Sequence, residues 1–276
     1  MAFTPYALDR LADEADYAVI GPHDGRTRVA DTRAFPYSAV CFVEREFGDG
    51  RFTTCTAFLI GPTTLLTAGH CVASPLRLRL GIPGVASRVK VWPGRDGKAS
   101  PYGFQWARRW RTHPAYLKHP RPANDIAVIE LDRPFEGAPG YFATACPSDA
   151  ELKRLRESRL VHVAGYPADK PAGTQWEHAE RLDRIDAARI RYSVDTCPGH
   201  SGSPVWILPG PGKRPVVIGV HTAGPKPHAE GAWGCKPGAP LAPAGLFNSG
   251  RRLTPELRHA LRLPAVLAGA GVHQNV

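Results

Sequence analysis

The chain lacks the long apolar run that a membrane-spanning helix requires. Such a helix needs about 20 consecutive apolar residues, and no stretch of this sequence approaches that length. The amino-terminal region also lacks the apolar core of a secretory signal peptide, because charged side chains interrupt it between Asp9 and Asp16. C-x-x-C spacings, internal repeats and low-complexity blocks are missing as well. We therefore expect no membrane partner, no repeat architecture and no cysteine-based metal site.

Glycine and proline, by contrast, are abundant. Of 276 residues, 28 are glycine and 28 are proline, and both types are scattered along the chain. Frequent turn residues between short apolar runs indicate a mostly β structure. The hydrophobic content of 43% is ordinary, so the chain can bury a sizeable core in one large domain or two small ones.

The formal net charge is +10, and a basic chain can bind nucleic acid or anionic surfaces. The Arg and Lys residues are spread along the sequence, with the densest cluster at 108–111. We interpret that cluster as a solvated strand face, because no nucleic-acid-binding motif accompanies it. No nucleic-acid partner is therefore expected.

Six cysteines can pair in many ways, so the sequence leaves their connectivity open. Disulfides form in oxidising compartments. We expect a secreted or otherwise extracytoplasmic protein whose export signal lies outside this numbering. A cytoplasmic protein with reduced thiols is the alternative.

The stretch from Thr196 to Pro204 is predicted to form a tight loop between two apolar runs, with Ser201 at its apex. A serine hydroxyl is a poor nucleophile unless a base and an orienting carboxylate lie beside it. The chain supplies both, because His70 follows one apolar run and Asp125 opens another. A buried carboxylate at a strand start is costly unless it is paired. Alone, Asp125 would be a turn-capping residue; with His70 and Ser201 present, we interpret it as catalytic.

The motifs TAGHC around His70, DIAVI from Asp125 and GHSGSP around Ser201 resemble those of trypsin-like serine peptidases, and most of all the bacterial glutamyl endopeptidase branch. Their order is that of the chymotrypsin class. The likeness, from about Val19 to Leu261, implies an all-β fold of two six-stranded antiparallel β-barrels with a C-terminal helix. It also implies a serine endopeptidase that cleaves protein or peptide substrates through this triad and an acyl-enzyme, without cofactor or metal. We expect a monomer; an inactive binding module of the same fold is the alternative.

The resemblance assigns the oxyanion hole to the backbone N–H groups of Gly199 and Ser201, and glycine suits this role because it readily adopts a positive φ. In chymotrypsin-like zymogens an aspartate just before the nucleophile pairs with a newly formed amino terminus. Here that position holds His200. We therefore expect this switch to be absent and His200 to face solvent.

Two sets of residues compete to explain specificity. Asp195, six residues before Ser201, matches the pocket floor that selects Arg and Lys in trypsin. Thr196, His221 and Thr222 instead resemble the pocket of glutamyl endopeptidases, where the residues matching Thr196 and His221 contact the substrate carboxylate. Two carboxylates about 4 Å apart at an effective dielectric near 20 repel by roughly 4 kcal/mol. Cleavage after Glu or Asp, which we favour, thus requires Asp195 to point away or to be neutralised; cleavage after Arg or Lys is the alternative.

The remaining expectations concern the chain's covalent and domain organisation. Three disulfides are predicted, two from the resemblance and the last by elimination: Cys55–Cys71, Cys197–Cys235 and Cys41–Cys146. Because Val19–Arg26 resembles the mature start of glutamyl endopeptidases, residues 1–18 are predicted to be a propeptide, whose removal frees an amino group that helps bind an acidic substrate side chain. Residues 19–145 would form the first barrel with His70 and Asp125, residues 146–263 the second with Ser201 and the final helix, and residues 264–276 a loose tail.

Local patterns predict individual elements. Strands are expected at 35–43, 54–60, 64–67 and 105–110. The alternation in Leu76–Leu80 predicts another strand, with the leucines buried and the arginines exposed. Helices are expected at 149–157 and from Pro255, with Thr254 as the N-cap.

Overall fold

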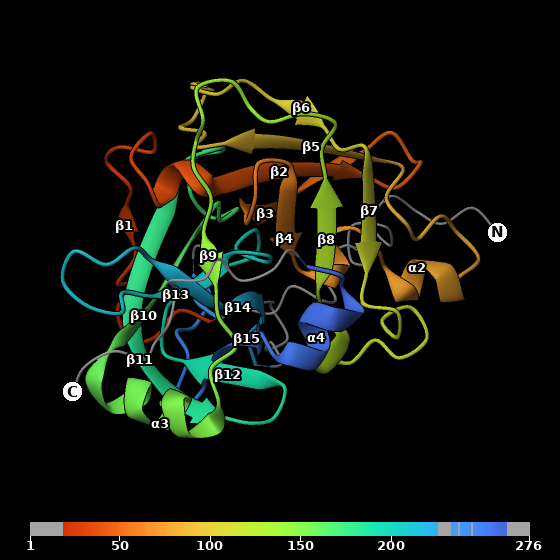
Figure 1. Cartoon of the computed structure of the whole chain (residues 1–276). Helices are drawn as coiled ribbons and strands as arrows, with labels where there is room; N and C mark the ends of the chain where they lie inside the picture. Colours follow the sequence, from red (N-terminus) through yellow and green to blue (C-terminus); the bar gives the residue numbers. More distant parts are fainter. Residues whose placement is uncertain (1–18, 226–232, 237, 244, 264–276) are drawn as a thin grey trace.

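The computed structural model describes residues 19–225, 233–236, 238–243 and 245–263, which form two β-barrels (Figure 1). The predicted propeptide, 1–18, and the predicted tail, 264–276, lie outside the described residues. Among the described residues, no helix combines the length and the apolar character needed to span a membrane.

The first barrel is built from seven short strands: β2 (Val40–Glu46), β3 (Phe52–Leu59), β4 (Thr64–Thr67), β5 (Arg88–Pro93), β6 (Gln105–Trp106), β7 (Arg109–Thr112) and β8 (Ala127–Glu130). They follow the order β6-β5-β2-β3-β4-β8-β7, and all pairs are antiparallel. β6 and β7 belong to one extended segment that changes partner. The Ala107 N–H donates to the carbonyl of Val89 in β5 (2.8 Å), and the next N–H, of Arg108, donates to Glu130 in β8 (2.9 Å). This segment joins the two edges of the sheet and closes a six-stranded barrel.

The second barrel has six strands: β10 (Leu160–Gly165), β11 (Trp176–Ile185), β12 (Arg189–Tyr192), β13 (Pro204–Ile207), β14 (Val216–Ala223) and β15 (Asn248–Arg252). Their order is β11-β10-β13-β14-β15-β12, and pairing of β11 with β12 closes the ring. A short strand, β9 (Ala143–Thr144), adds to β14 in parallel. The predicted pair of six-stranded antiparallel barrels is therefore confirmed.

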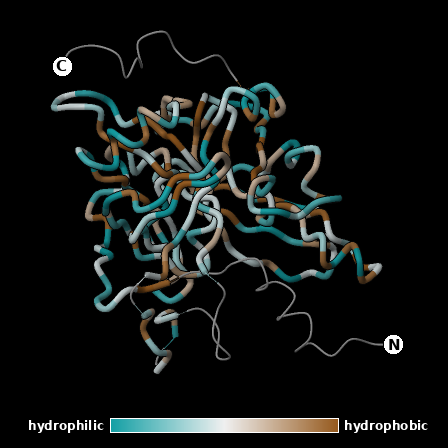
Figure 2. The backbone as a smooth tube through the Cα atoms, turned by 90° about the horizontal axis from the view of Figure 1, so that it is seen from below, coloured by the Kyte–Doolittle hydropathy of each residue, from teal (hydrophilic) through white to brown (hydrophobic). Residues whose placement is uncertain are grey.

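The apolar segments gather towards the interior of the molecule, and the hydrophilic ones lie mostly at its periphery (Figure 2). Aromatic rings continue the first core across to the second barrel. Phe142 packs against Phe58 of β3 at 5.8 Å between ring centroids and against Trp206 of β13 at 5.7 Å. Aromatic side chains bury large apolar areas, so this contact helps to hold the two barrels in one relative position.

Both ends of the described chain cross to the opposite barrel. β1 (Thr27–Arg28) pairs with β11 of the second barrel. The C-terminal helix α4 (Pro255–Ala260) buries Leu257 in the core of the first barrel, and Arg111 of β7 donates to the carbonyl of Leu261 (2.6 Å). These two crossings connect the two barrels. The domain boundary predicted near residue 145 stays a prediction.

The two predicted helices are present, and each begins at the residue that the sequence indicates. α3 (Asp149–Ser158) starts with a capping box between Ser148 and Glu151. In α4 the Thr254 hydroxyl accepts a hydrogen bond from the Leu257 N–H (3.2 Å). Such caps satisfy backbone donors that have no partner within the helix.

The predicted strand at Leu76–Leu80 is wrong, because the chain forms the short helix α2 (Pro75–Arg79) there. Ser74 caps it, and Pro75 is preorganised for a first helical position. Burial also differs from the expectation at Arg77, Leu78 and Leu80. Arg77 is buried and donates to the carbonyl of Pro83 (2.7 Å), whereas Leu78 is 41% exposed. Local capping overrides a five-residue alternation.

Candidate active site

Two turns at the ends of β4 and β8 bring His70 to Asp125. His70 lies in the 3-10 turn Gly69–Cys71, and Asp125 directly follows the turn Pro122–Asn124. Oδ1 of Asp125 accepts the backbone N–H of His70 (2.9 Å), and Oδ2 lies 2.8 Å from Nδ1 of the ring. An ionised carboxylate only accepts hydrogen bonds, so Nδ1 carries the proton and Nε2 is the basic nitrogen. Both side chains are buried, which strengthens the pairing.

Ser201 lies on the loop between β12 and β13, and this loop docks directly on the first barrel. The Thr56 N–H of β3 donates to the Ser201 carbonyl (2.9 Å), and Sγ of Cys71 lies 3.4 Å from the same oxygen. Gly202 has φ +88°, and a Cβ there would lie 2.0 Å from the carbonyl oxygen of Thr56. The close approach therefore requires glycine. This approach places the Ser201 backbone next to Cys71, the residue that follows His70.

The backbone around Gly199 has the conformation that an inward-pointing amide needs. Its φ is +98°, and a Cβ would lie 2.4 Å from the carbonyl oxygen of Tyr166. Thr56 holds this turn from the other barrel, because its hydroxyl donates to the Gly199 carbonyl (2.8 Å). The Ser201 hydroxyl lies 3.5 Å from the carbonyl of Thr222. The assignment of Gly199 and Ser201 to an oxyanion hole stays a prediction.

His200 does not face solvent, so that expectation is wrong. Its side chain is 1% exposed, and Nδ1 accepts the backbone N–H of Cys197 (3.1 Å). Burial, with a further contribution from the nearby Arg26, holds the pKa of His200 well below its ordinary value. The ring is therefore neutral, and it folds back to brace its own loop.

The residues assigned to the specificity pocket flank the serine loop. The Gly202 N–H donates to the His221 carbonyl (2.8 Å), while Thr196 lies at the other end of the loop. Among the described residues, the Thr196 hydroxyl and Nε2 of His221 are buried without a hydrogen-bond partner. Burial, and then the proximity of His70, lowers the pKa of His221 to about 3. Thr222, also buried, lies with its hydroxyl 3.5 Å from the carbonyl of Ser249. Buried unpaired polar atoms are costly, and each of these two groups can still form a hydrogen bond.

Two backbone N–H groups of the amino-terminal segment bind the carboxylate of Asp195. Its Oδ1 accepts the Gly21 N–H (2.7 Å) and its Oδ2 accepts the Gly25 N–H (2.8 Å). Nδ1 of His178 lies 3.4 Å from Oδ2 and accepts the backbone N–H of Asp195 (2.8 Å). The carboxylate is 4% exposed. Its two oxygens thus provide hydrogen-bond acceptors for backbone N–H groups of residues 21–25.

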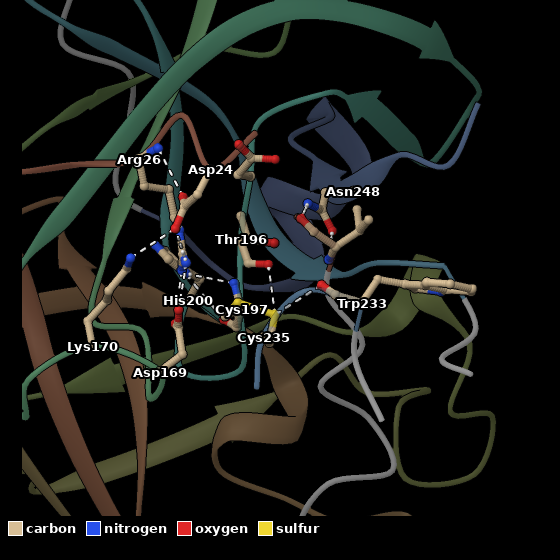
Figure 3. The surroundings of a disulfide bond; sticks show 12 residues. Asp24, Arg26, Asp169, Lys170, Thr196, Cys197, His200, Trp233, Cys235 and Asn248 are labelled. Carbon is tan, nitrogen blue, oxygen red and sulfur yellow. Dashed lines mark hydrogen bonds and ion pairs between the residues drawn. A yellow bond between two sulfur atoms is a disulfide. The ribbon is translucent and has the colours of Figure 1, made fainter. Parts of the chain in front are cut away.

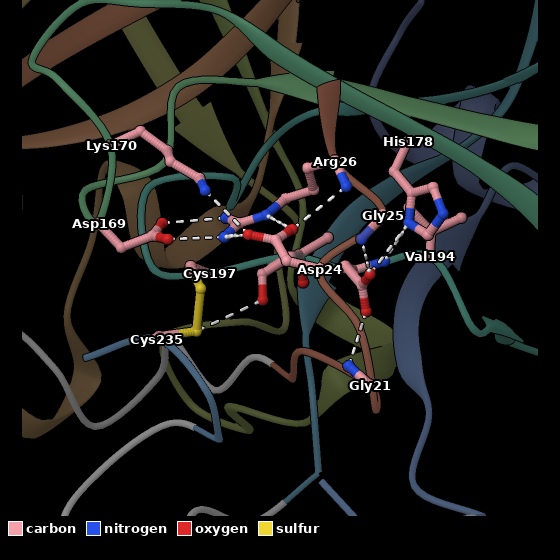
Figure 4. A network of polar contacts seen from close by, with 12 residues as sticks. Gly21, Asp24, Gly25, Arg26, Asp169, Lys170, His178, Val194, Cys197 and Cys235 are labelled. Atoms are coloured by element: carbon pink, nitrogen blue, oxygen red, sulfur yellow. Dashed lines mark hydrogen bonds and ion pairs between the residues drawn. A yellow bond between two sulfur atoms is a disulfide. The ribbon is translucent and has the colours of Figure 1, made fainter. Parts of the chain in front are cut away.

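A second anchor of the same segment was not predicted. The guanidinium of Arg26 is buried and forms two parallel hydrogen bonds to Asp169, at 2.9 and 2.6 Å, and two to Asp24, at 2.8 and 2.9 Å (Figure 4). Lys170 completes the network by donating to Asp24 (2.8 Å). Although burial opposes it, the hydrogen bonds from Arg26 and Lys170 hold the pKa of Asp24 well below its ordinary value. The resemblance singled out Val19–Arg26, but nothing in the sequence pairs that segment with Asp169 or Lys170.

The Arg26 network lies beside the serine loop, next to His200 and the Cys197–Cys235 disulfide (Figure 3). The Ala168 N–H, adjacent to Asp169, donates to the carbonyl of Pro198 (2.7 Å). The turn that contains Gly199 is therefore braced from one side by this network and from the other by the first barrel.

Two of the three predicted disulfides are present, Cys55–Cys71 and Cys197–Cys235. The third is wrong, because Cys41 and Cys146 are free thiols. Cys41 is fully buried on β2 in the first barrel, whereas Cys146 is partly exposed on the connection that follows β9. His70 lies with the sulfurs of Cys55 and Cys71 in a cluster of metal-ligand type. Those sulfurs are bonded to each other, so neither can bind a metal as a thiolate.

Comparisons with known proteins agree with this geometry. Residues 25–235 match the family model described as Trypsin. A glutamyl endopeptidase of Bacillus licheniformis is 33% identical over 75% of this chain and 61% of its own length. A Bacillus subtilis protein named extracellular metalloprotease is 30% identical over 75% of this chain and 63% of its own length. The chain thus spans less than two thirds of these curated relatives.

A solved structure supports the same grouping. A Glu endopeptidase structure superimposes with a TM-score of 0.68 at 25% identity, covering 88% of this chain and 98% of the other. The two barrels, the His70–Asp125 pair and the docked serine loop agree with the family model, which spans most of the sequence. The chain belongs to the trypsin family.

Proposed function

We propose that the protein is a serine endopeptidase that acts through Ser201, His70 and Asp125. Ser201 attacks the peptide carbonyl, and Nε2 of His70 takes its proton and returns it to the leaving amine. Asp125 orients the imidazole and stabilises its charged form. The backbone N–H groups of Gly199 and Ser201 stabilise the oxyanion; removing one such donor costs roughly 3 kcal/mol of transition-state stabilisation. The observation that carries the proposal is the 2.8 Å contact between Asp125 and Nδ1 of His70, beside the docked serine loop.

Replacing the nucleophile tests this proposal. Ser201→Ala is expected to abolish peptidase activity and labelling by a serine-directed phosphonylating probe, with an unchanged melting temperature. The wild-type protein should be labelled at Ser201 alone. Failure of the wild type to react with the probe would favour the alternative of an inactive binding module.

We propose further that the enzyme cleaves after Glu, or Asp, in protein and peptide substrates. Support comes from the unpaired Thr196 hydroxyl and from Nε2 of His221, two groups that can donate to a substrate carboxylate. The carboxylate of Asp195 is held by the Gly21 and Gly25 N–H groups, which argues against its role as an open acceptor for Arg or Lys. Relatives named glutamyl endopeptidase support the same preference.

Peptides that differ only in Glu, Gln or Arg before the scissile bond test this preference. The Glu peptide is expected to have the highest kcat/KM. His221→Ala should lower the Glu over Gln ratio, whereas the matched control His162→Ala should not, because His162 lies on β10 and stacks on Trp206. A wild-type enzyme that prefers Arg would refute the pocket assignment.

The amino-terminal segment has a place in the same proposal. Cleavage at Ala18–Val19 would create an ammonium group on Val19, whose backbone nitrogen lies 3.1 Å from Oδ1 of Asn248. The Val19 carbonyl accepts the Thr196 N–H (3.1 Å), so this end of the segment adjoins the proposed pocket. We propose a secreted, monomeric protein that is activated by this cleavage; two disulfides fit an oxidising compartment. Amino-terminal sequencing of active protein should begin at Val19.

A further inference from the structure

Tyr192 reaches His221 across an intervening strand. Tyr192 ends β12, and His221 lies in β14, with β15 between them. Gly250 of β15 pairs with His221, and a Cβ there would lie 3.2 Å from the Tyr192 hydroxyl. The missing side chain leaves room for the phenol, whose oxygen lies 2.8 Å from Nδ1 of His221. Both side chains are fully buried.

We propose that Tyr192 is a positioning residue for substrate specificity, whose hydroxyl holds His221 in the tautomer that carries its proton on Nε2. The inference rests on the proposed preference for Glu. It adds a residue that touches no substrate and acts through His221.

Two arrangements of protons fit a distance of 2.8 Å. Either the phenol donates to Nδ1, or Nδ1 donates to the phenol oxygen. In the second arrangement the phenol proton needs another acceptor, and the described residues provide none for it. A buried donor without an acceptor is costly. The first arrangement satisfies both groups and leaves the proton of the ring on Nε2.

Both groups are in the required charge state. Burial raises the pKa of Tyr192 well above its ordinary value, so the phenol keeps its proton. Burial and the proximity of His70 lower the pKa of His221 to about 3, so the imidazole is neutral at neutral pH and has one proton to place. Because the neutral ring of His221 carries a single proton, only one of its two nitrogens can donate a hydrogen bond.

The tautomer decides what the pocket can bind. The carboxylate of a Glu side chain is ionised at neutral pH and only accepts hydrogen bonds. Nε2–H of His221 can donate to it alongside the Thr196 hydroxyl, whereas a bare Nε2 lone pair would repel it. The same lone pair would accept the amide N–H of Gln. The phenol of Tyr192 therefore sets the sign of the discrimination between Glu and Gln.

The resting enzyme tests the tautomer directly. ¹⁵N NMR of histidine-labelled protein, with the His221 signals assigned by comparison with His221→Gln, should show a protonated Nε2 and an unprotonated Nδ1. A protonated Nδ1 would overturn the proposal. This measurement uses no substrate, so it is independent of whether the enzyme prefers Glu.

The variant Tyr192→Phe tests the consequence. It removes only the hydroxyl, and the kcat/KM ratio of matched Glu and Gln peptides should fall roughly 10- to 100-fold, as expected for one hydrogen bond to a charged group. The loss should lie in the Glu peptide, mainly in KM, with the Gln rate retained. Tyr37→Phe is the control, because Tyr37 donates a similar hydrogen bond to Glu177 (2.6 Å) outside the pocket. An unchanged ratio in a folded Tyr192→Phe protein would overturn the proposal.

Discussion

Among the residues that the structure describes, two buried aspartates lie beside a histidine Nδ1, one in each barrel. At Asp125, Nδ1 of His70 lies 2.8 Å away and donates to the carboxylate. At Asp195, Nδ1 of His178 lies 3.4 Å away and is already the acceptor for a backbone N–H. The first carboxylate therefore orients an imidazole, and the second holds the backbone of residues 21–25. The same two residue types thus have a proposed catalytic role in one barrel and a structural role in the other, because Nδ1 donates to the carboxylate of Asp125 but accepts the backbone N–H of Asp195.

The largest expected effect is on catalysis at the first pair. Asp125→Asn places an amide N–H opposite Nδ1 and reverses the tautomer of His70. The kcat should fall about 10⁴-fold, with little change in the urea midpoint of unfolding. Steady-state kinetics on a Glu peptide measure it. A loss below tenfold would mean that Asp125 does not orient the base.

The next test asks what anchors the segment that Asp195 holds. Arg26→Ala leaves Asp169 and Asp24 without their buried partner, so the free energy of unfolding should fall by about 3 kcal/mol or more. Arg28→Ala is the matched control. Its pair with Asp96 is exposed and should contribute less than about 1 kcal/mol. Equal losses in the two variants, measured by urea denaturation, would contradict the anchoring role.

The variant Asp195→Asn tests the same amino-terminal segment through its other anchor, the carboxylate of Asp195. The amide keeps one acceptor, so either the Gly21 or the Gly25 N–H loses its partner, at a cost of about 1 to 3 kcal/mol in unfolding free energy. Asp31→Asn is the control, because Asp31 accepts the Arg33 N–H (3.0 Å) at the surface. The Glu preference should survive in Asp195→Asn. If the wild type cleaves after Arg and Asp195→Asn loses that cleavage, Asp195 lines the pocket and the structural role is contradicted.

The smallest expected effect is on the pH dependence of stability, and it comes from His221, which pairs with the phenol of Tyr192 and not with a carboxylate. The pKa of His221 is about 3 in the folded protein, below the ordinary value of 6.5, so the unfolded chain binds more protons between these values. Stability from His221 is therefore complete above pH 6.5 and declines as the pH falls towards 3. Between pH 7 and pH 6 the loss should be about 0.5 to 1 kcal/mol. Urea unfolding of wild type and His221→Gln at both pH values measures it, and an equal pH dependence in the two proteins would contradict it.

Short-range signals in the sequence predicted well where the determinant is local. Thr254 and Pro255 begin α4 as expected, because a cap depends on residues within one turn. The strand predicted at Leu76–Leu80 failed although the signal was also local, since Ser74 and Pro75 start a helix that a five-residue alternation concealed. His200 was misplaced because its burial depends on its own loop folding back, so that Nδ1 accepts the backbone N–H of Cys197.

The sequence by itself indicated a mostly β structure, because turn residues and apolar runs are properties of short stretches, and its motifs indicated the family and its two barrels through resemblance. It also indicated two disulfides through resemblance. Only the tertiary structure decided which partners each polar group meets. Cys41 and Cys146 stay unpaired, Asp195 is turned towards residues 21–25, and Tyr192 reaches His221 over a glycine. Such contacts join residues from distant parts of the chain, and the energy of a buried hydrogen bond depends on a geometry that no local pattern encodes.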